Sequence, residues 1–92
     1  MRLSEKEVKL IKTTVLDIFT DAQLYLFGSR LDDAKKGGDI DLFIISKDAT
    51  FTNKIKALAK LKRLLHKPVD LVLHKDFSRE IEKEALKGIR II

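Results

Sequence analysis

The sequence lacks cysteine, contains a single proline and four glycines, and has no long hydrophobic run. Without cysteine the chain can form neither a disulfide nor a cysteine-ligated zinc site, which fits a reducing compartment. Residues 1–20 show no apolar core followed by a small-residue cleavage site, and no segment is long enough to span a bilayer. We therefore expect a cytoplasmic protein with no membrane-spanning segment.

The composition is that of a folded globular protein. Hydrophobic residues make up 45% of the 92 residues and charged residues 36%, which excludes disorder, and there is no internal repeat, low-complexity segment or linker. We expect one domain over residues 1–92. The net charge of +5 would attract an anionic ligand such as a nucleotide. Because this charge is spread along the chain, a nucleic-acid partner is disfavoured.

Hydrophobic periodicity predicts an α/β fold, a small mixed sheet of three or four strands packed with helices. A capping box at Ser4 predicts a helix over residues 5–19. Thr52 or Asp48 is expected to cap the next helix. Asp76 is expected to cap a last helix that ends near Lys87 and points Phe77, Ile81, Ala85 and Leu86 inward. Strands are predicted at 23–27, 39–45 and 69–73, and the apolar tail 89–92 is expected to dock on the domain or on a second chain such as another copy of this one.

Three aspartates stand beside or within predicted strands. Asp39 and Asp41 open the second strand, where residues two apart share a face, and Asp70 lies inside the apolar third strand. Like charges about 5 Å apart would cost on the order of 3 kcal/mol per pair at an effective dielectric near 20, and a divalent cation would relieve that repulsion. Asp70 has two interpretations from its surroundings alone: it pairs with a basic residue or it belongs to a metal site.

The first strand ends abruptly in Gly28, Ser29 and Arg30. Glycine lets the backbone approach a ligand closely, and amides at a turn leading into a helix can bind phosphate. The structural alternative is a strand-to-helix turn with Ser29 as N-cap. Arg30 could contact a phosphate or pair with Asp32 or Asp33, and the sequence does not decide between these.

The pattern of Gly28-Ser29, nine intervening residues, and Asp39-Ile-Asp41 resembles the signature of the DNA polymerase β-like nucleotidyltransferase superfamily. Asp70 matches the third acidic residue that this family has on a later strand. The short chain is similar to the minimal nucleotidyltransferases of bacteria and archaea. The resemblance implies the minimal nucleotidyltransferase fold and an enzyme.

The resemblance also implies roles for these residues. Asp39 and Asp41 would hold Mg²⁺ on a nucleoside triphosphate, and Asp70 would complete a second Mg²⁺ position and help to deprotonate a hydroxyl. Gly28 and Ser29 would cradle the β and γ phosphates, with Arg30 as a further nucleotide contact. The implied reaction transfers a nucleoside monophosphate, AMP from ATP, and releases pyrophosphate.

Minimal nucleotidyltransferases are commonly paired with a HEPN protein, which implies an antitoxin that adds AMP to a tyrosine of its HEPN toxin. Two alternatives remain: a non-catalytic module that neutralises its partner by binding, and transfer to RNA or to a small molecule. The chain departs from the family at Gly38, where a serine is usual. Neither His66 nor His74 has the neighbours that a zinc site requires.

Overall fold

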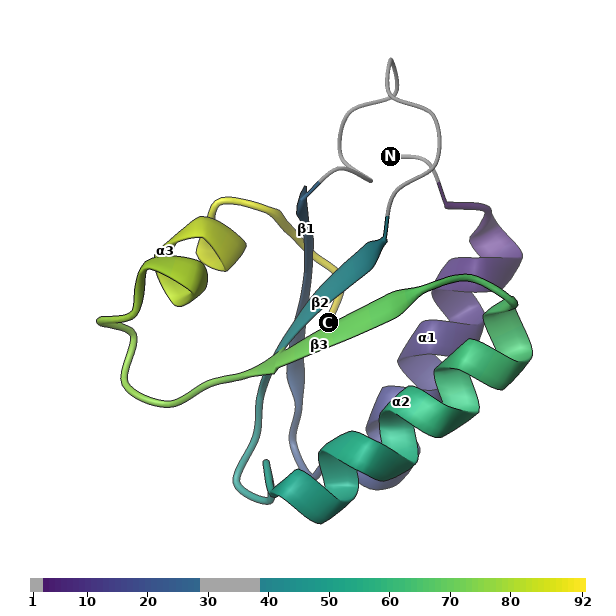
Figure 1. Ribbon diagram of the computed structural model, residues 1–92, viewed down its shortest axis with the longest axis horizontal. Coiled ribbons are helices and arrows are strands. Elements are labelled where there is room, and N and C mark those ends of the chain that lie inside the picture. The colour runs from purple at the N-terminus through teal and green to yellow at the C-terminus, as the bar shows by residue number, and fades with distance from the viewer. Residues whose placement is uncertain (1–2, 29–38) are drawn as a thin grey trace.

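The structure, a computed structural model, describes residues 3–28 and 39–92 (Figure 1). The positions of Ser29, Arg30 and Gly38 therefore lie outside the described residues. Along the described chain the elements are α1 (Glu5–Ile18), β1 (Gln23–Phe27), β2 (Ile40–Ile45), α2 (Phe51–Leu65), β3 (Val69–Leu73), α3 (Glu80–Leu86) and β4 (Ile89–Arg90).

The strands form a mixed sheet in the order β3-β2-β1-β4. β2 runs parallel to β3 and antiparallel to β1, and β4 pairs antiparallel with the other edge of β1. β2 is apolar on both faces, which predicts an interior strand, and it lies between two neighbours as expected. The predicted small mixed sheet is confirmed.

Helices α1 and α2 pack side by side on one face of the sheet, and α3 lies against the opposite face (Figure 1). The face toward α1 and α2 forms the main core, which includes Leu24, Leu26, Ile40, Leu42, Ile44, Val69 and Leu71 from the strands and Ile11, Val15, Phe19, Ala57, Leu61 and Leu65 from the helices and their ends. On the other face Phe27 and Phe43 pack with Ala85 of α3. By strand alternation Asp41 lies on this second face, which has fewer buried residues than the face toward α1 and α2.

The two long helices have side-chain caps. Ser4 Oγ accepts a hydrogen bond from the Glu7 amide while the Glu7 carboxylate accepts one from the Ser4 amide, which confirms the predicted capping box. The predicted caps of α2 were wrong, because Thr50 is the N-cap and accepts from the Asn53 amide. Asp48 instead accepts hydrogen bonds from the amide and the hydroxyl of Thr20, which follows the C-cap of α1.

Helix α3 begins later than predicted. It starts at Glu80, because the Asp76 carboxylate caps a turn by accepting from the Ser78 amide. Of the side chains expected to point inward only that of Ala85 is buried, whereas Ile81 is 45% exposed. Phe77 and Leu86 are also exposed. The apolar pattern was misleading here because a charged residue, Glu82, occupies the inward position.

The C-terminal tail docks on the domain, as expected. The Ile91 amide donates to the Leu24 carbonyl at 2.7 Å, and both Ile91 and Ile92 pack against the main core. A Cβ atom at Gly88 would collide with the Leu26 carbonyl, so glycine permits the close passage that leads into β4. Among residues 3–28 and 39–92, no helix is both long and apolar enough to cross a membrane.

The turn between β3 and α3 is organised by Glu82, whose side chain is fully buried. Its carboxylate accepts hydrogen bonds from His74 Nδ1 at 2.6 Å, from Arg79 Nε at 2.8 Å and from the amides of Lys75, Asp76 and Phe77. Burial alone would raise the pKa of Glu82, but these donors outweigh it and lower the pKa to about 2.

We predict that Glu82→Gln lowers the free energy of unfolding at neutral pH by about 3 kcal/mol, because the buried carboxylate that bonds to Arg79 and His74 loses its charge. The pKa of Glu82 falls from the ordinary value of 4.5 on folding, so its contribution is present above that pH and is lost as the pH drops toward about 2. Urea unfolding across this range measures both effects.

The matched control is Glu84→Gln, whose side chain is 66% exposed and which should change stability by less than about 0.5 kcal/mol. Equal stability of the two variants, or an unaltered acid limb in Glu82→Gln, would contradict the assigned role of Glu82.

Candidate active site

Two of the three predicted site aspartates lie side by side on adjacent strands, and the third is close to them in sequence. In the parallel pairing of β2 with β3, Asp41 lies directly opposite Asp70, so both side chains lie on the face away from α1 and α2. Asp39 immediately precedes β2 and is exposed. The register of two strands that are far apart in sequence thus brings Asp70 beside the Asp39 and Asp41 pair.

The carboxylates influence one another electrostatically. Partial burial raises the pKa of Asp41, and the negative charges of Asp70 and then Asp39 raise it further. Within the described part of the chain, no lysine, arginine or histidine nitrogen lies within 4.0 Å of any of these three carboxylates. Of the two interpretations of Asp70, the described residues therefore do not support pairing with a base.

Gly28 is placed by the same strands. Phe27 pairs with Asp41 across β1 and β2, and the next residue, Gly28, has φ of +81°. A Cβ atom at position 28 would collide with Asp41 Oδ2. Glycine is therefore required here both for the left-handed backbone and to leave room for the Asp41 carboxylate. The predicted contacts from Ser29 and Arg30 lie outside the described residues.

The donor set fits a hard divalent cation, since Mg²⁺ prefers carboxylate oxygens together with water and phosphate. The described residues nevertheless contain no three acidic, histidine or cysteine side chains already close enough to hold one ion. One reason is that Asp70 Oδ1 accepts a hydrogen bond from the Leu71 amide at 3.0 Å. Asp70 would release this amide in order to turn toward Asp41.

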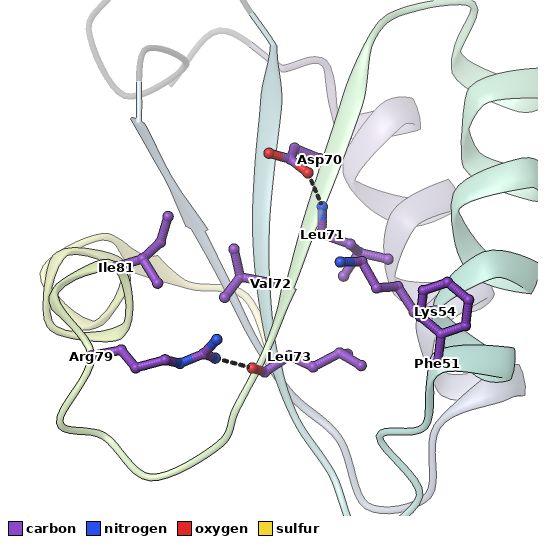
Figure 2. Close-up of a pocket in the computed structure, with 8 residues that line it drawn as sticks. All are labelled: Phe51, Lys54, Asp70, Leu71, Val72, Leu73, Arg79 and Ile81. Atoms are coloured by element: carbon purple, nitrogen blue, oxygen red, sulfur yellow. Dashed lines mark hydrogen bonds between the residues drawn. The ribbon is translucent and has the colours of Figure 1, made fainter.

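Two hollows lie near the candidate site, and Asp70 lines only the first of them. One, of about 420 Å³, runs along β3 and is lined by Phe51, Lys54, Asp70, Leu71, Val72, Leu73, Arg79 and Ile81 (Figure 2). The other, of about 410 Å³, is lined by Phe27, Gly28, Glu84, Lys87 and Gly88. The sequence did not indicate that Lys54, Arg79 and Lys87 line these hollows, because only the packing of α2 and α3 against the sheet brings them there. His74 lines neither hollow, and its Nδ1 donates a hydrogen bond to Glu82.

Comparison with protein-family models gives a match to "Polymerase beta, Nucleotidyltransferase" over residues 9–92. The chain belongs to this nucleotidyltransferase family. The resemblance inferred from the glycine, serine and aspartate pattern is thereby confirmed. Comparison with curated protein sequences gives no significant match.

Solved structures show that the nucleotidyltransferase fold extends over almost the whole chain. A crystal structure of a mutant toxin–antitoxin MntA–HpeT is similar with a TM-score of 0.78 and 24% identity, covering 94% of this chain and 71% of that one. A rebuilt and re-refined structure of a tri-AMPylated Shewanella oneidensis HEPN toxin in complex with MNT antitoxin gives 0.79 and 20%, covering 98% and 72%. The predicted fold class is confirmed.

For this nucleotidyltransferase we predict that Gly28→Ala displaces the Asp41 carboxylate and weakens Mn²⁺ binding by at least about tenfold, as loss of a supporting contact does in other metal sites. The left-handed backbone adds a stability cost of about 1 kcal/mol. Mn²⁺ titration followed by electron paramagnetic resonance measures the affinity, and urea unfolding measures the stability.

Gly88→Ala is the control, because its Cβ atom would meet the Leu26 carbonyl rather than an aspartate. It should lose stability and keep its Mn²⁺ affinity. Unchanged Mn²⁺ affinity in Gly28→Ala would show that Gly28 does not position Asp41 for a metal.

Proposed function

We propose that this nucleotidyltransferase moves AMP from ATP to a hydroxyl acceptor with the help of Mg²⁺ held by Asp39, Asp41 and Asp70. The observation that carries the proposal is the placement of Asp41 opposite Asp70, with no basic side chain neutralising either one among the described residues. The like charges that raise the pKa of Asp41 also lower the stability of the fold, and a bound cation would offset their repulsion.

Each of the candidate site residues would have its own role in this reaction. Asp39 and Asp41 would hold Mg²⁺ on the triphosphate, and Asp70 would complete a second Mg²⁺ position and accept the proton of the attacking hydroxyl. Gly28 and Ser29 would face the β and γ phosphates, with Arg30 as a further nucleotide contact. Bound Mg²⁺ supplies charge stabilisation for the attacking and leaving oxygens.

The bonds balance as an in-line substitution. The bond between the acceptor oxygen and the α phosphorus forms while the bond from that phosphorus to the bridging oxygen breaks. Pyrophosphate leaves with the electron pair, and the hydroxyl proton passes to the Asp70 carboxylate.

We further propose that the acceptor is a tyrosine of a HEPN-type toxin and that the chain acts as the antitoxin. The two solved structures described above are toxin–antitoxin complexes or mutants of them, and one contains a tri-AMPylated HEPN toxin. A non-catalytic binding module would gain nothing from neighbouring aspartates that no basic side chain of residues 3–28 and 39–92 neutralises, so the charge arrangement favours transfer over simple occlusion.

The test is transfer of labelled AMP from ATP, in the presence of Mg²⁺, to a HEPN toxin, to total RNA and to small-molecule extracts. We expect label on the toxin. In Asp41→Asn the rate should fall by at least about 10³-fold, because the loss of a metal carboxylate removes several kcal/mol of transition-state stabilisation.

The same variant should be slightly more stable than the wild type in metal-free buffer, by about 0.5–2 kcal/mol, since removing one negative charge relieves the repulsion. Asp17→Asn, at a 62%-exposed position on α1, is the control and should change neither quantity. Full transfer by Asp41→Asn would rule out the assignment, and label on RNA or on a small molecule would replace the proposed acceptor.

A further inference from the structure

β3 is an edge strand, and its outward side is only partly used. The Pro68 carbonyl and the His74 amide both bond to β2, so alternation turns the amides and carbonyls of Leu71 and Leu73 away from the sheet. The Leu71 amide donates to Asp70 Oδ1, and the Leu73 carbonyl accepts from the Arg79 guanidinium at 2.6 Å.

Val69 also turns its amide and carbonyl outward, but it does not line the larger hollow. Along that hollow two outward groups remain, the carbonyl of Leu71 and the amide of Leu73. Neither has a hydrogen-bond partner in the part of the chain that the structure describes. A residue in an added parallel strand would use this combination, because it bonds to the carbonyl of one residue and the amide two positions later. An antiparallel strand needs both groups of one residue, and at each of these residues one group is occupied.

The free edge forms the floor of the larger hollow, which we call the β3-edge groove. Phe51 and Lys54 of α2 form one wall, and Arg79 and Ile81 form the other (Figure 2). Phe51 is 74% exposed and Ile81 is 45% exposed, so both walls offer apolar contact. Asp70 lies at one end, and the groove is therefore continuous with the candidate active site.

We propose that the β3-edge groove binds an extended segment of the acceptor polypeptide as an added parallel strand. This inference rests on the proposed transfer to a protein hydroxyl and deepens it by naming how the acceptor docks. Such strand addition gains affinity from main-chain hydrogen bonds and selectivity from alternate side chains.

The register specifies the sequence of the bound segment. The residue that bonds to Leu71 and Leu73 lies beside Val72, against Ile81, and is apolar. The residue two positions earlier lies beside Asp70 on the same face and carries the acceptor hydroxyl. A tyrosine suits this position, because its ring can extend across the strand spacing of about 4.8 Å toward Asp41.

The residue between these two lies on the opposite face, toward α2. Lys54 reaches from α2 toward Leu71 on that face, and it has no carboxylate within 4.0 Å among the described residues (Figure 2). An acidic side chain complements it. The preferred segment is therefore tyrosine, then an acidic residue, then an apolar residue.

Short fluorescein-labelled peptides test this order without nucleotide or metal. A peptide with the central order tyrosine, glutamate, valine should bind at least about fivefold more tightly than one with tyrosine, valine, glutamate. The reason is that only the first peptide places its glutamate beside Lys54, where one charge-assisted hydrogen bond can form. N-methylation of the valine amide, which faces β3, should weaken binding to a similar extent. N-methylation of the glutamate amide, which faces away, should not.

Lys54→Glu should abolish the preference for glutamate, whereas Lys56→Glu, an exposed change on the same helix, should leave it unchanged. Equal binding of the two peptides or tolerance of the methylated valine amide would overturn the proposal. So would a short oligouridine that displaces the peptide and depends on Lys54 in the same way, because the groove would then be a nucleic-acid site.

Failure of this inference differs from failure of the proposed function. If the peptide binds as described but no AMP is transferred in the presence of ATP and Mg²⁺, the docking surface stands and the enzymatic proposal fails. If the Lys54→Glu variant modifies a HEPN toxin normally while the peptides do not bind, the enzymatic proposal stands and the docking proposal fails.

Discussion

The parallel pairing of β2 with β3 is the constraint on which the candidate active site depends. It places Asp41 opposite Asp70 at a spacing of about 4.8 Å between strands. A slip of one residue would turn Asp41 or Asp70 into the apolar layer under α1 and α2, so burial of Ile40, Leu42 and Leu71 holds the register. Hydrophobic burial thus holds together charges that repel one another.

The surroundings of Glu82 and Asp41 shift the pKa values of these two carboxylates in opposite directions. Glu82 is fully buried but accepts hydrogen bonds from two side chains and three amides, and its pKa is lowered to about 2. Asp41 is only partly buried, yet burial and its acidic neighbours raise its pKa. The first carboxylate stabilises a turn, whereas the second costs stability at a position where a cation ligand is useful.

Much of the fold could be predicted from local patterns. The bounds of β1 and β3 agree with the predicted segments, and β2 and α1 each differ by one residue, because alternation and the capping box are local signals. The start of α3 could not be predicted, since Asp76 and Glu82 both satisfy amides of the same turn and only the folded geometry shows which of them organises it. The same holds for Ile81, whose apolar character indicated burial that the helix does not provide.

The sequence by itself determined the family pattern, the strands β1, β2 and β3, and the aspartates Asp39, Asp41 and Asp70 that stand in or beside two of them. These follow from residue identity and short-range periodicity. Only the tertiary structure decided that position 28 needs glycine to leave room for Asp41, that Lys54 and Arg79 form the walls of one groove, and that the Leu71 carbonyl and the Leu73 amide have no partner among the described residues. Such facts depend on which elements pack together, and contacts between distant segments leave no periodic signal in a single chain.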